Sequence, residues 1–407
     1  MSQDNVGNVG NVGNVGNVGN VGNVGNVGNV GNVGNVGNVG NVGNVGNVGN
    51  VGEAISSYSS GALLSARDGI VGTWVDPVAA PPALDGDDPK NLKRWSATVR
   101  ASVFDSVVHA KLGVKTAQMP DGSTGCVARH MDPVGGADPF ADSPAESHAI
   151  VALPRPDITN VFLKQLPYLR TYADLRADRA SEIFSQTGDI LSFMGTIGLL
   201  HPARTRWTIE LLSLVLRTTV TVEMNMKNVL AVRRPQELSA QVQPMIQTPP
   251  HGAFPSGHAG ESFAVATVMA ELTKDRQDQV YGPNNHVWTE QFMRQAARIA
   301  TNRVVAGVHY PIDSSAGQIL GTSIGLYLLE RFRAGTGTMH GVYFDANQCA
   351  DKDFDPRAIA DAFDAIYSGT PNPGAAPYVE DKATWIMDST GDQMLNYLWR
   401  QAKKEWT

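Results

Sequence analysis

The chain has 407 residues, a formal net charge of −7 and two cysteines, Cys126 and Cys349. An acidic chain is a poor general binder of nucleic acid or of an anionic membrane surface. Two cysteines that lie far apart in sequence, in no metal-ligand spacing, indicate free thiols instead of a disulfide framework or a zinc site. We therefore expect small-molecule substrates and no nucleic-acid partner, and a local cationic pocket remains compatible with this charge.

Residues 5–52 are sixteen consecutive copies of Asn-Val-Gly. Glycine at every third position is a collagen feature, but the tract has no proline to pre-set the extended conformation. Gly and Asn also oppose helix and strand. We predict a disordered tail over 1–52, with a stacked β-solenoid as the alternative. The N-terminus has no basic region followed by an apolar run, so we expect no secretory signal and, by default, a cytoplasmic location.

The rest of the chain is dominated by helical apolar spacing. Residues 53–150 are expected to form an irregular and partly helical N-terminal region, with a helix near 92–112 and Gly-, Pro- and Asp-rich loops at 116–146. Predicted helices follow at 172–186, 189–200, 205–232, 260–274, 289–305, 314–333, 356–367 and 381–404. We expect a catalytic helical domain over 151–335 and a C-terminal helical extension over 336–407. No apolar run reaches the roughly 18–20 residues that cross a bilayer, so the expected fold class is a soluble all-α bundle.

Two cations open the group of candidate site residues. Lys227 and Arg234 are seven residues apart, which on one helix separates them by only about 20°, and Pro235 is expected to end that helix. Arg offers a planar fork and Lys a point charge, a pair that suits a phosphate-like anion. A solvated Lys/Arg face is the commoner meaning of such a pair when it occurs alone.

A second segment reads His251-Gly-Ala-Phe-Pro-Ser-Gly-His258, followed by an apolar helical pattern. Ser256 and Gly257 then lie at a loop-to-helix junction, where Ser is a good N-cap and Gly lets the backbone approach a ligand. Free N–H groups at a helix start attract anions. His258, in the first turn, is placed to exchange a proton there. A plain capped helix with an incidental histidine is the alternative.

A third segment contains Arg303, His309 and Asp313. Arg303 and His309 are six residues apart, and Gly307 and Pro311 predict a helix end between them that turns His309 back towards one pocket. Asp313 is then expected to hydrogen-bond the second imidazole nitrogen and fix its tautomer. Taken alone, a surface arginine and a satisfied core histidine are the commoner explanation of these residues.

Together the segments read Lys-x6-Arg-Pro, Pro-Ser-Gly-His and Arg-x5-His-x3-Asp, in this order. The pattern resembles the superfamily of type 2 phosphatidic acid phosphatases, bacterial nonspecific acid phosphatases and vanadium-dependent haloperoxidases, over about residues 190–335. One departure is Asn302, where the family often has Ser before the arginine.

The resemblance implies a role for each matching residue. It implies that the equatorial oxygens of an oxyanion are bound by Lys227, Arg234, Ser256, Gly257 and Arg303. By the same resemblance His258 is the general acid/base, Lys227 and Asp313 assist catalysis, and His309 either attacks phosphorus or coordinates vanadium. The family fold implied is the acid phosphatase/haloperoxidase helical bundle, in which homo-oligomers also occur.

The sequence carries features of both branches of this superfamily. A long segment before the core and a second histidine, His251, at the offset seen in vanadium bromoperoxidases and iodoperoxidases favour a haloperoxidase, with His251 in a halide pocket. The short interval between His258 and Arg303 and the His309-Tyr-Pro-x-Asp313 run favour a phosphatase. We rank first the oxidation of bromide or iodide by hydrogen peroxide with vanadate as cofactor. A soluble, cofactor-free phosphomonoesterase with a phospho-His intermediate is the alternative, and a non-catalytic phosphate-binding protein the second.

Overall fold

The computed structural model describes residues 66–67, 69–119, 122–131 and 148–407, so the expected tail over 1–52 lies outside the described residues. The chain divides into two compact units, Met1–Asp85 and Gly86–Thr407. In the first unit, the described residues expose several large apolar side chains, including Trp74, Val75 and Val78. The second unit contains the candidate site residues and all the elements named below.

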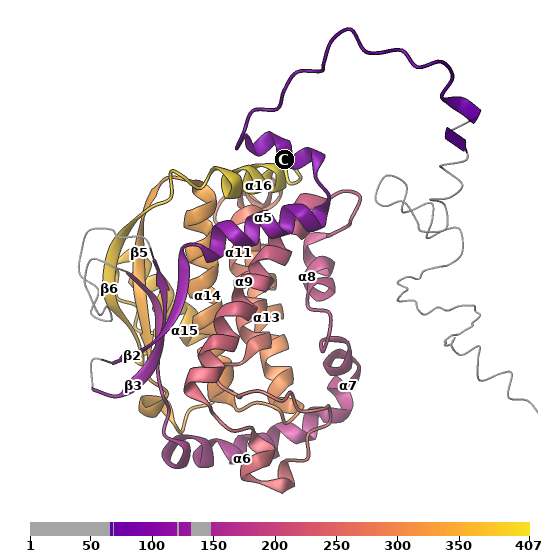
Figure 1. Cartoon of the computed structure of the whole chain (residues 1–407). Helices are drawn as coiled ribbons and strands as arrows, with labels where there is room; N and C mark the ends of the chain where they lie inside the picture. Colours follow the sequence, from indigo (N-terminus) through magenta and orange to yellow (C-terminus); the bar gives the residue numbers. More distant parts are fainter. Residues whose placement is uncertain (1–65, 68, 120–121, 132–147) are drawn as a thin grey trace, which may run out of the picture. The chain divides into compact units, whose positions relative to one another are not determined.

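Four long helices form the centre of the second unit (Figure 1). They are α9 (Arg206–Leu230), α11 (Gly257–Leu272), α13 (Val287–Val305) and α14 (Pro311–Arg333). Around them lie η2 (Pro89–Arg94), α5 (Ala97–His109), η3 (Ile158–Phe162), α6 (Leu163–Tyr172), η4 (Ala173–Leu175), α7 (Arg176–Ser185), α8 (Leu191–Gly198), α10 (Pro235–Leu238), η5 (Ala240–Val242), α12 (Lys274–Tyr281), η6 (Ala346–Cys349), α15 (Pro356–Ser368) and α16 (Gln393–Lys403). The helices expected from 205 to 333 are therefore present, with ends shifted by a few residues.

Helices α11 and α14 pack unusually closely, because three glycines of α14 face α11. A Cβ on Gly321 would lie 2.2 Å from the carbonyl oxygen of Gly260, and one on Gly317 would lie 2.6 Å from that of Ser256. Gly325 meets Thr267 in the same way, at 2.8 Å. Backbones this close leave no room for side chains. The contact fixes the starts of α11 and α14 against each other. These starts carry the second motif, Pro-Ser-Gly-His258, and the His309–Asp313 part of the third motif.

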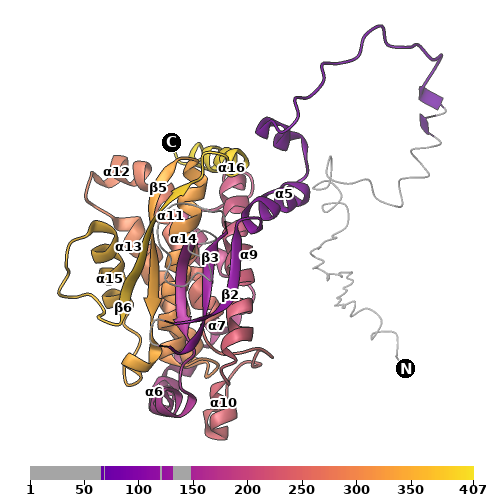
Figure 2. The ribbon, with the colours of Figure 1, turned by 60° about the vertical axis from the view of Figure 1, so that its left-hand side comes forward.

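The expected all-α fold holds only in part: the described chain is mostly helical, but five of its strands form one sheet. They are β2 (Leu112–Gln118), β3 (Thr124–His130), β4 (His148–Pro154), β5 (Thr336–Phe344) and β6 (Val379–Asp388), in the order β2-β3-β4-β5-β6. Only β4 and β5 pair in parallel, and the other neighbours are antiparallel. The sheet packs against α9 and α14 (Figure 2). It joins segments from before and after the central helices, so the C-terminal segment is not purely helical as expected.

The physical reason for this error lies in the burial of the central strands. Almost every residue of β3 and β4 is buried, on both faces of the sheet. Such strands lack the alternation of apolar and polar residues that marks a half-exposed strand.

Among the described residues no helix is long and apolar enough to span a membrane. Cys126 and Cys349 are both buried free thiols, as expected.

Candidate active site

The first motif is divided between two helices. Lys227 lies in the last turn of α9, which ends at Leu230, and Arg234 is the N-cap of α10. The expectation that the two cations share one helix face is therefore wrong, and Pro235 begins a helix instead of ending one. Ala231 has a positive φ of 51° that redirects the chain. Both cations are nevertheless 2% exposed and point inwards.

Lys227 and Arg234 are both anchored to backbone carbonyls of neighbouring loops. The Lys227 ammonium donates to the carbonyl of Pro255 and, at 3.4 Å, to that of Gly252. Burial lowers the pKa of Lys227 to about 8, against the opposing effect of Glu223. Arg234 Nε donates to the His251 carbonyl at 2.9 Å, and its Nη1 donates to the Val308 carbonyl at 2.8 Å. The loops of the second and third motifs thus converge on the first.

The second motif supplies the start of α11. Ser256 is its N-cap residue, and the Ser256 N–H donates to the Asp313 carbonyl at 2.9 Å. The Ser256 hydroxyl is buried and has no hydrogen-bond partner. At Gly257 a Cβ would lie 2.3 Å from a carboxylate oxygen of Glu223, so glycine is required there by packing. His258 Nε2 lies 2.7 Å from the Gln186 carbonyl oxygen, which only a protonated nitrogen can satisfy.

The third motif places His309 between an acid and a cation. The turn after α13 uses Gly307, at φ 81°, and His309 comes just before α14. The Asp313 carboxylate accepts from His309 Nδ1 at 2.9 Å, the contact expected from the spacing. The opposite nitrogen, Nε2, therefore carries the lone pair, and Arg234 Nη1 donates to it at 3.0 Å.

The electrostatics show that the motif residues form one cluster. The pKa of His309 lies well below its ordinary value, first because of burial and then because Arg234 and Lys227 are near. His258 and Arg303 contribute to the same shift. Burial and then Arg303 lower the pKa of His258 to about 4. Both imidazoles are consequently neutral at pH 7, among three buried cationic side chains.

His251 also lies at this cluster, at its edge. Its Nδ1 is 3.1 Å from Arg234 Nη2, a donor, and its side chain is half-buried. Burial and then Lys227 lower its pKa. His251 and His309 therefore both contact the Arg234 guanidinium.

Gln186 joins two motifs and was missed by the sequence reasoning. It follows the last residue of α7, is fully buried, and its side-chain oxygen accepts from Arg303 Nη2 at 3.1 Å and Asn302 Nδ2 at 3.0 Å. Its backbone carbonyl faces His258. Asn302, the departure from the family pattern, therefore helps to position Arg303 through Gln186. The only signal in the sequence was the predicted helix end at 186, which says nothing about contacts.

We predict that Gln186→Leu will weaken inorganic phosphate binding by about tenfold, the loss of one hydrogen bond to a charged group. The matched control is Gln277→Leu, because Gln277 is also fully buried but bonds to the backbone of Trp288 and Thr289 on α13. Isothermal titration with phosphate measures the phosphate affinity of both variants. Equal phosphate affinity in the parent and the Gln186 variant would contradict a positioning role, whereas Gln277→Leu should lower only the thermal unfolding temperature.

Glu223 is a second buried residue that the motifs do not include. It lies one helical turn before Lys227, is 1% exposed, and its Oε2 has no hydrogen-bond partner. Burial, and then Glu261, raise the pKa of Glu223 well above the ordinary value of 4.5. The folded protein therefore keeps a proton on Glu223 that the unfolded chain releases above that value.

This proton gives a prediction for stability against pH. Because the unfolded state binds fewer protons, Glu223 makes the free energy of unfolding fall as pH rises above about 4.5, by up to about 1.4 kcal/mol per pH unit. Glu223→Gln removes this loss, so the variant should gain stability over the parent between about pH 5 and pH 7. Urea unfolding of the parent and the variant at about pH 5 and pH 7 measures this gain in the free energy of unfolding. Glu271→Gln, at a partly exposed carboxylate of α11 that pairs with Arg333, is the matched control for the loss of a carboxylate. A pH-independent difference for Glu223→Gln would contradict the argument.

Several donors in the cluster are left without acceptors. They are the Ser256 hydroxyl, Arg303 Nε and Gln186 Nε2, all buried. Buried donors in folded proteins nearly always have partners. Together with the three cationic side chains they form a cradle whose chemistry fits a tetrahedral or trigonal oxyanion such as phosphate or vanadate.

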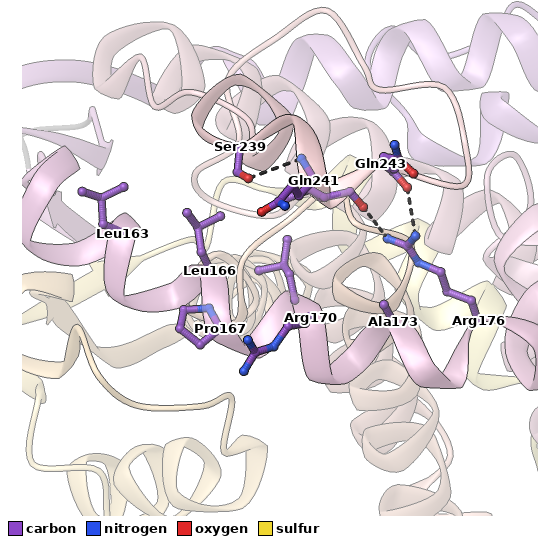
Figure 3. A pocket seen from close by; sticks show the side chains of 11 residues that line it. Leu163, Leu166, Pro167, Arg170, Ala173, Arg176, Ser239, Gln241 and Gln243 are labelled. Carbon is purple, nitrogen blue, oxygen red and sulfur yellow. Dashed lines mark hydrogen bonds between the residues drawn. The ribbon is translucent and has the colours of Figure 1, made fainter.

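A pocket of about 420 Å³ elsewhere on the chain is not this site. It lies between α6 and the segment Ser239–Gln243 (Figure 3). Arg176, in its wall, is held by the carbonyls of Val242 and Gln243 at 3.0 and 2.9 Å, and no motif residue lines it. A smaller pocket of about 320 Å³, by contrast, has His258 in its wall.

Comparisons with known proteins match two regions of the chain. Residues 207–334, which contain all three motifs, match the family described as PAP2 superfamily, and residues 3–58 match the collagen triple helix repeat. One similar solved structure is described as the first transmembrane PAP2 type phosphatidylglycerolphosphate phosphatase from Bacillus subtilis. It is 17% identical, covers 42% of this chain and 94% of that chain, and has a TM-score of 0.26. No curated protein matches the chain.

Proposed function

Because residues 207–334 belong to the PAP2 superfamily, we propose that the chain is a phosphoesterase that hydrolyses phosphate monoesters through a phosphorylated His309. This reverses the order expected from the sequence, which ranked halide oxidation first. Superfamily membership supports phosphoester chemistry, and nothing in the comparisons favours a peroxidase. The observation that carries the proposal is the neutral His309, whose Nδ1 is held by Asp313 and whose Nε2 faces the cationic cradle.

His309 Nε2 has the properties of a nucleophile for phosphorus. Its lone pair is available because burial and nearby cations keep the imidazole unprotonated. Asp313 stabilises the positive charge that develops on the ring as the N–P bond forms. Arg234 Nη1 occupies the Nε2 lone pair in this structure, so the incoming phosphoryl group must draw the guanidinium onto its own oxygens.

The cradle supplies charge where the transition state needs it. Phosphoryl transfer spreads negative charge over three equatorial oxygens, and preorganised donors stabilise that charge. Lys227, Arg234 and Arg303 provide the cations, and Ser256 with the N–H groups of the α11 start provides neutral donors. The side chains are already buried at the site before the ester arrives, and the rearrangement required is that of the Arg234 guanidinium, which leaves His309 Nε2 for the phosphoryl oxygens.

His258 completes the reaction on the leaving-group side. A bound phosphate group raises the pKa of a nearby imidazole from its low value, so His258 takes the proton that a monoanionic ester brings and gives it to the departing alkoxide. The neutral imidazole then takes a proton from the water that attacks phospho-His309, and the N–P bond breaks. Inorganic phosphate leaves with that proton, so both histidines are neutral again. No metal or organic cofactor enters these steps.

Halide oxidation with bound vanadate is the second candidate function. One observation favours it: His251 lies at the site, 3.1 Å from Arg234, in agreement with the halide-pocket role implied by the resemblance. The same cradle residues would hold the vanadate oxygens, with His309 as the protein ligand. Bound vanadate would supply activation of hydrogen peroxide towards bromide or iodide.

The test uses the full chain, purified without added metal. Hydrolysis of p-nitrophenyl phosphate that is inhibited by orthovanadate is the expected result. In parallel, the vanadate-loaded protein is assayed for peroxide-dependent oxidation of bromide and iodide, with a His258→Ala variant as background. Halide oxidation without ester hydrolysis would replace the first candidate by the second. Phosphate binding with neither activity would indicate a non-catalytic phosphate-binding protein.

A further inference from the structure

A pocket of about 320 Å³ lies on the His258 side of the cradle. Its wall is formed by the segment that links α7 to α8, by one residue of α9 and by the first turns of α11. The residues that matter here are Gln186, Asp189, Ile190, Leu216, His258 and Glu261. His309 is 4% exposed and does not line it.

The position of His258 relates this pocket to the reaction. Attack and departure at phosphorus are in line, so the leaving group lies opposite the His309 nitrogen. His258, the proposed proton donor, must reach the leaving oxygen and is the motif residue that opens to this pocket. In this mechanism the alcohol part of the ester therefore occupies this pocket, beside Gln186 and away from buried His309.

The wall of the pocket carries carboxylates but no lysine or arginine. Two carboxylates, Asp189 and Glu261, line the pocket together with apolar Ile190 and Leu216, and none of its lining residues is Lys or Arg. Glu261 is three residues after His258 on α11 and so shares its face. Asp189 is exposed and accepts from the N–H of Ser192 at 3.0 Å, which holds the carboxylate at the rim.

We propose that this pocket receives the leaving group and that Asp189 and Glu261 select neutral or cationic leaving groups over anionic ones. The inference rests on the proposed phosphatase function and adds a substrate class: monoesters of small amino alcohols or apolar alcohols. A second phosphate in the pocket meets two carboxylates, whereas an ammonium group is attracted by both. The cations of the cradle face the equatorial oxygens of the phosphoryl group, which all these substrates share.

The test compares three substrates that differ in leaving-group charge: O-phosphoethanolamine, phenyl phosphate and inorganic pyrophosphate. Assays are run at about pH 8, where Glu261, whose pKa is raised by burial to about 7, is ionised. Glu261→Lys should raise kcat/KM for pyrophosphate relative to phenyl phosphate by about tenfold and lower it for O-phosphoethanolamine by a similar factor, as expected for one charge reversal nearby. Dividing each variant's ratio by the parent's ratio cancels both the overall activity of the protein and the intrinsic reactivity of the esters.

The matched control is Glu271→Lys, which makes the same charge change on the same helix, at a carboxylate that pairs with Arg333. Its ratios should equal those of the parent. Asp189→Asn, a milder change, should shift the ratios in the same direction and serves if Glu261→Lys does not fold. Unchanged ratios in a protein that hydrolyses phenyl phosphate overturn the pocket assignment alone. No hydrolysis of any ester by the parent overturns the proposed function and this inference with it.

Discussion

His309→Ala is expected to abolish ester hydrolysis, lowering kcat/KM on the order of 10⁴-fold or more. Without the imidazole no covalent intermediate forms, and water must attack phosphorus directly in a buried site. The cradle remains, because Lys227 and Arg234 keep their bonds to the carbonyls of Pro255 and Val308. The variant should therefore still bind phosphate while it fails to turn over.

Two measurements separate this outcome from simple misfolding. The first is titration with inorganic phosphate, which should show affinity within about tenfold of the parent. The second is rapid acid-free quenching with a radiolabelled ester, which should label the parent at His309 and leave the variant unlabelled. His251→Ala is the matched control, because His251 contacts Arg234 at the same site but is not the proposed nucleophile. A labelled His309→Ala protein would assign the nucleophile to another residue.

The motif residues were predictable because each motif is local in sequence. The His309–Asp313 hydrogen bond and the placement of Ser256 at a helix start depend on spacings of a few residues. Gln186 and Glu223 were not predictable, because their contacts depend on the packing of α7 and α9 against the motif helices. Gln186 meets Arg303 across 117 residues of sequence. The prediction that Lys227 and Arg234 share one helix face is wrong because α9 ends at Leu230, before Arg234.

The helices were predictable and the sheet was not, for a related reason. An amphipathic helix shows its period within its own residues, but β4 and β5 pair across almost two hundred residues, for example Val151 with Val342. One signal was present and misread. In β6, Ala383, Trp385 and Met387 are buried and alternate with exposed residues, yet the helical spacing of the sequence predicts a helix over 381–404 that includes this run. Strand alternation over such a short run is weak beside a longer helical pattern.

His258→Ala is expected to lower kcat/KM by about 10²–10⁴-fold for esters with poor leaving groups. The same change should cost little for 2,4-dinitrophenyl phosphate, whose leaving group departs without a proton. The reason is the position of His258: it lines the leaving-group pocket, and its Nε2 donates to the Gln186 carbonyl at 2.7 Å. The proton that moves to the alkoxide is a second one, which the imidazole gains when the ester binds, because a neutral imidazole does not give up its only N–H proton.

The dependence on the leaving group distinguishes proton donation from a structural role. The pKa of His258 is about 4, because it is buried beside Arg303, so in the free protein the imidazole is uncharged above that pH. Its proton must then arrive with the ester, and a monoanionic ester is the better substrate. Steady-state rates for phenyl phosphate and 2,4-dinitrophenyl phosphate, from about pH 5 to pH 8, measure both effects. Equal losses on the two esters would instead mean that His258 only supports the start of α11, and the proton donor would have to be sought among the carboxyl groups of the pocket.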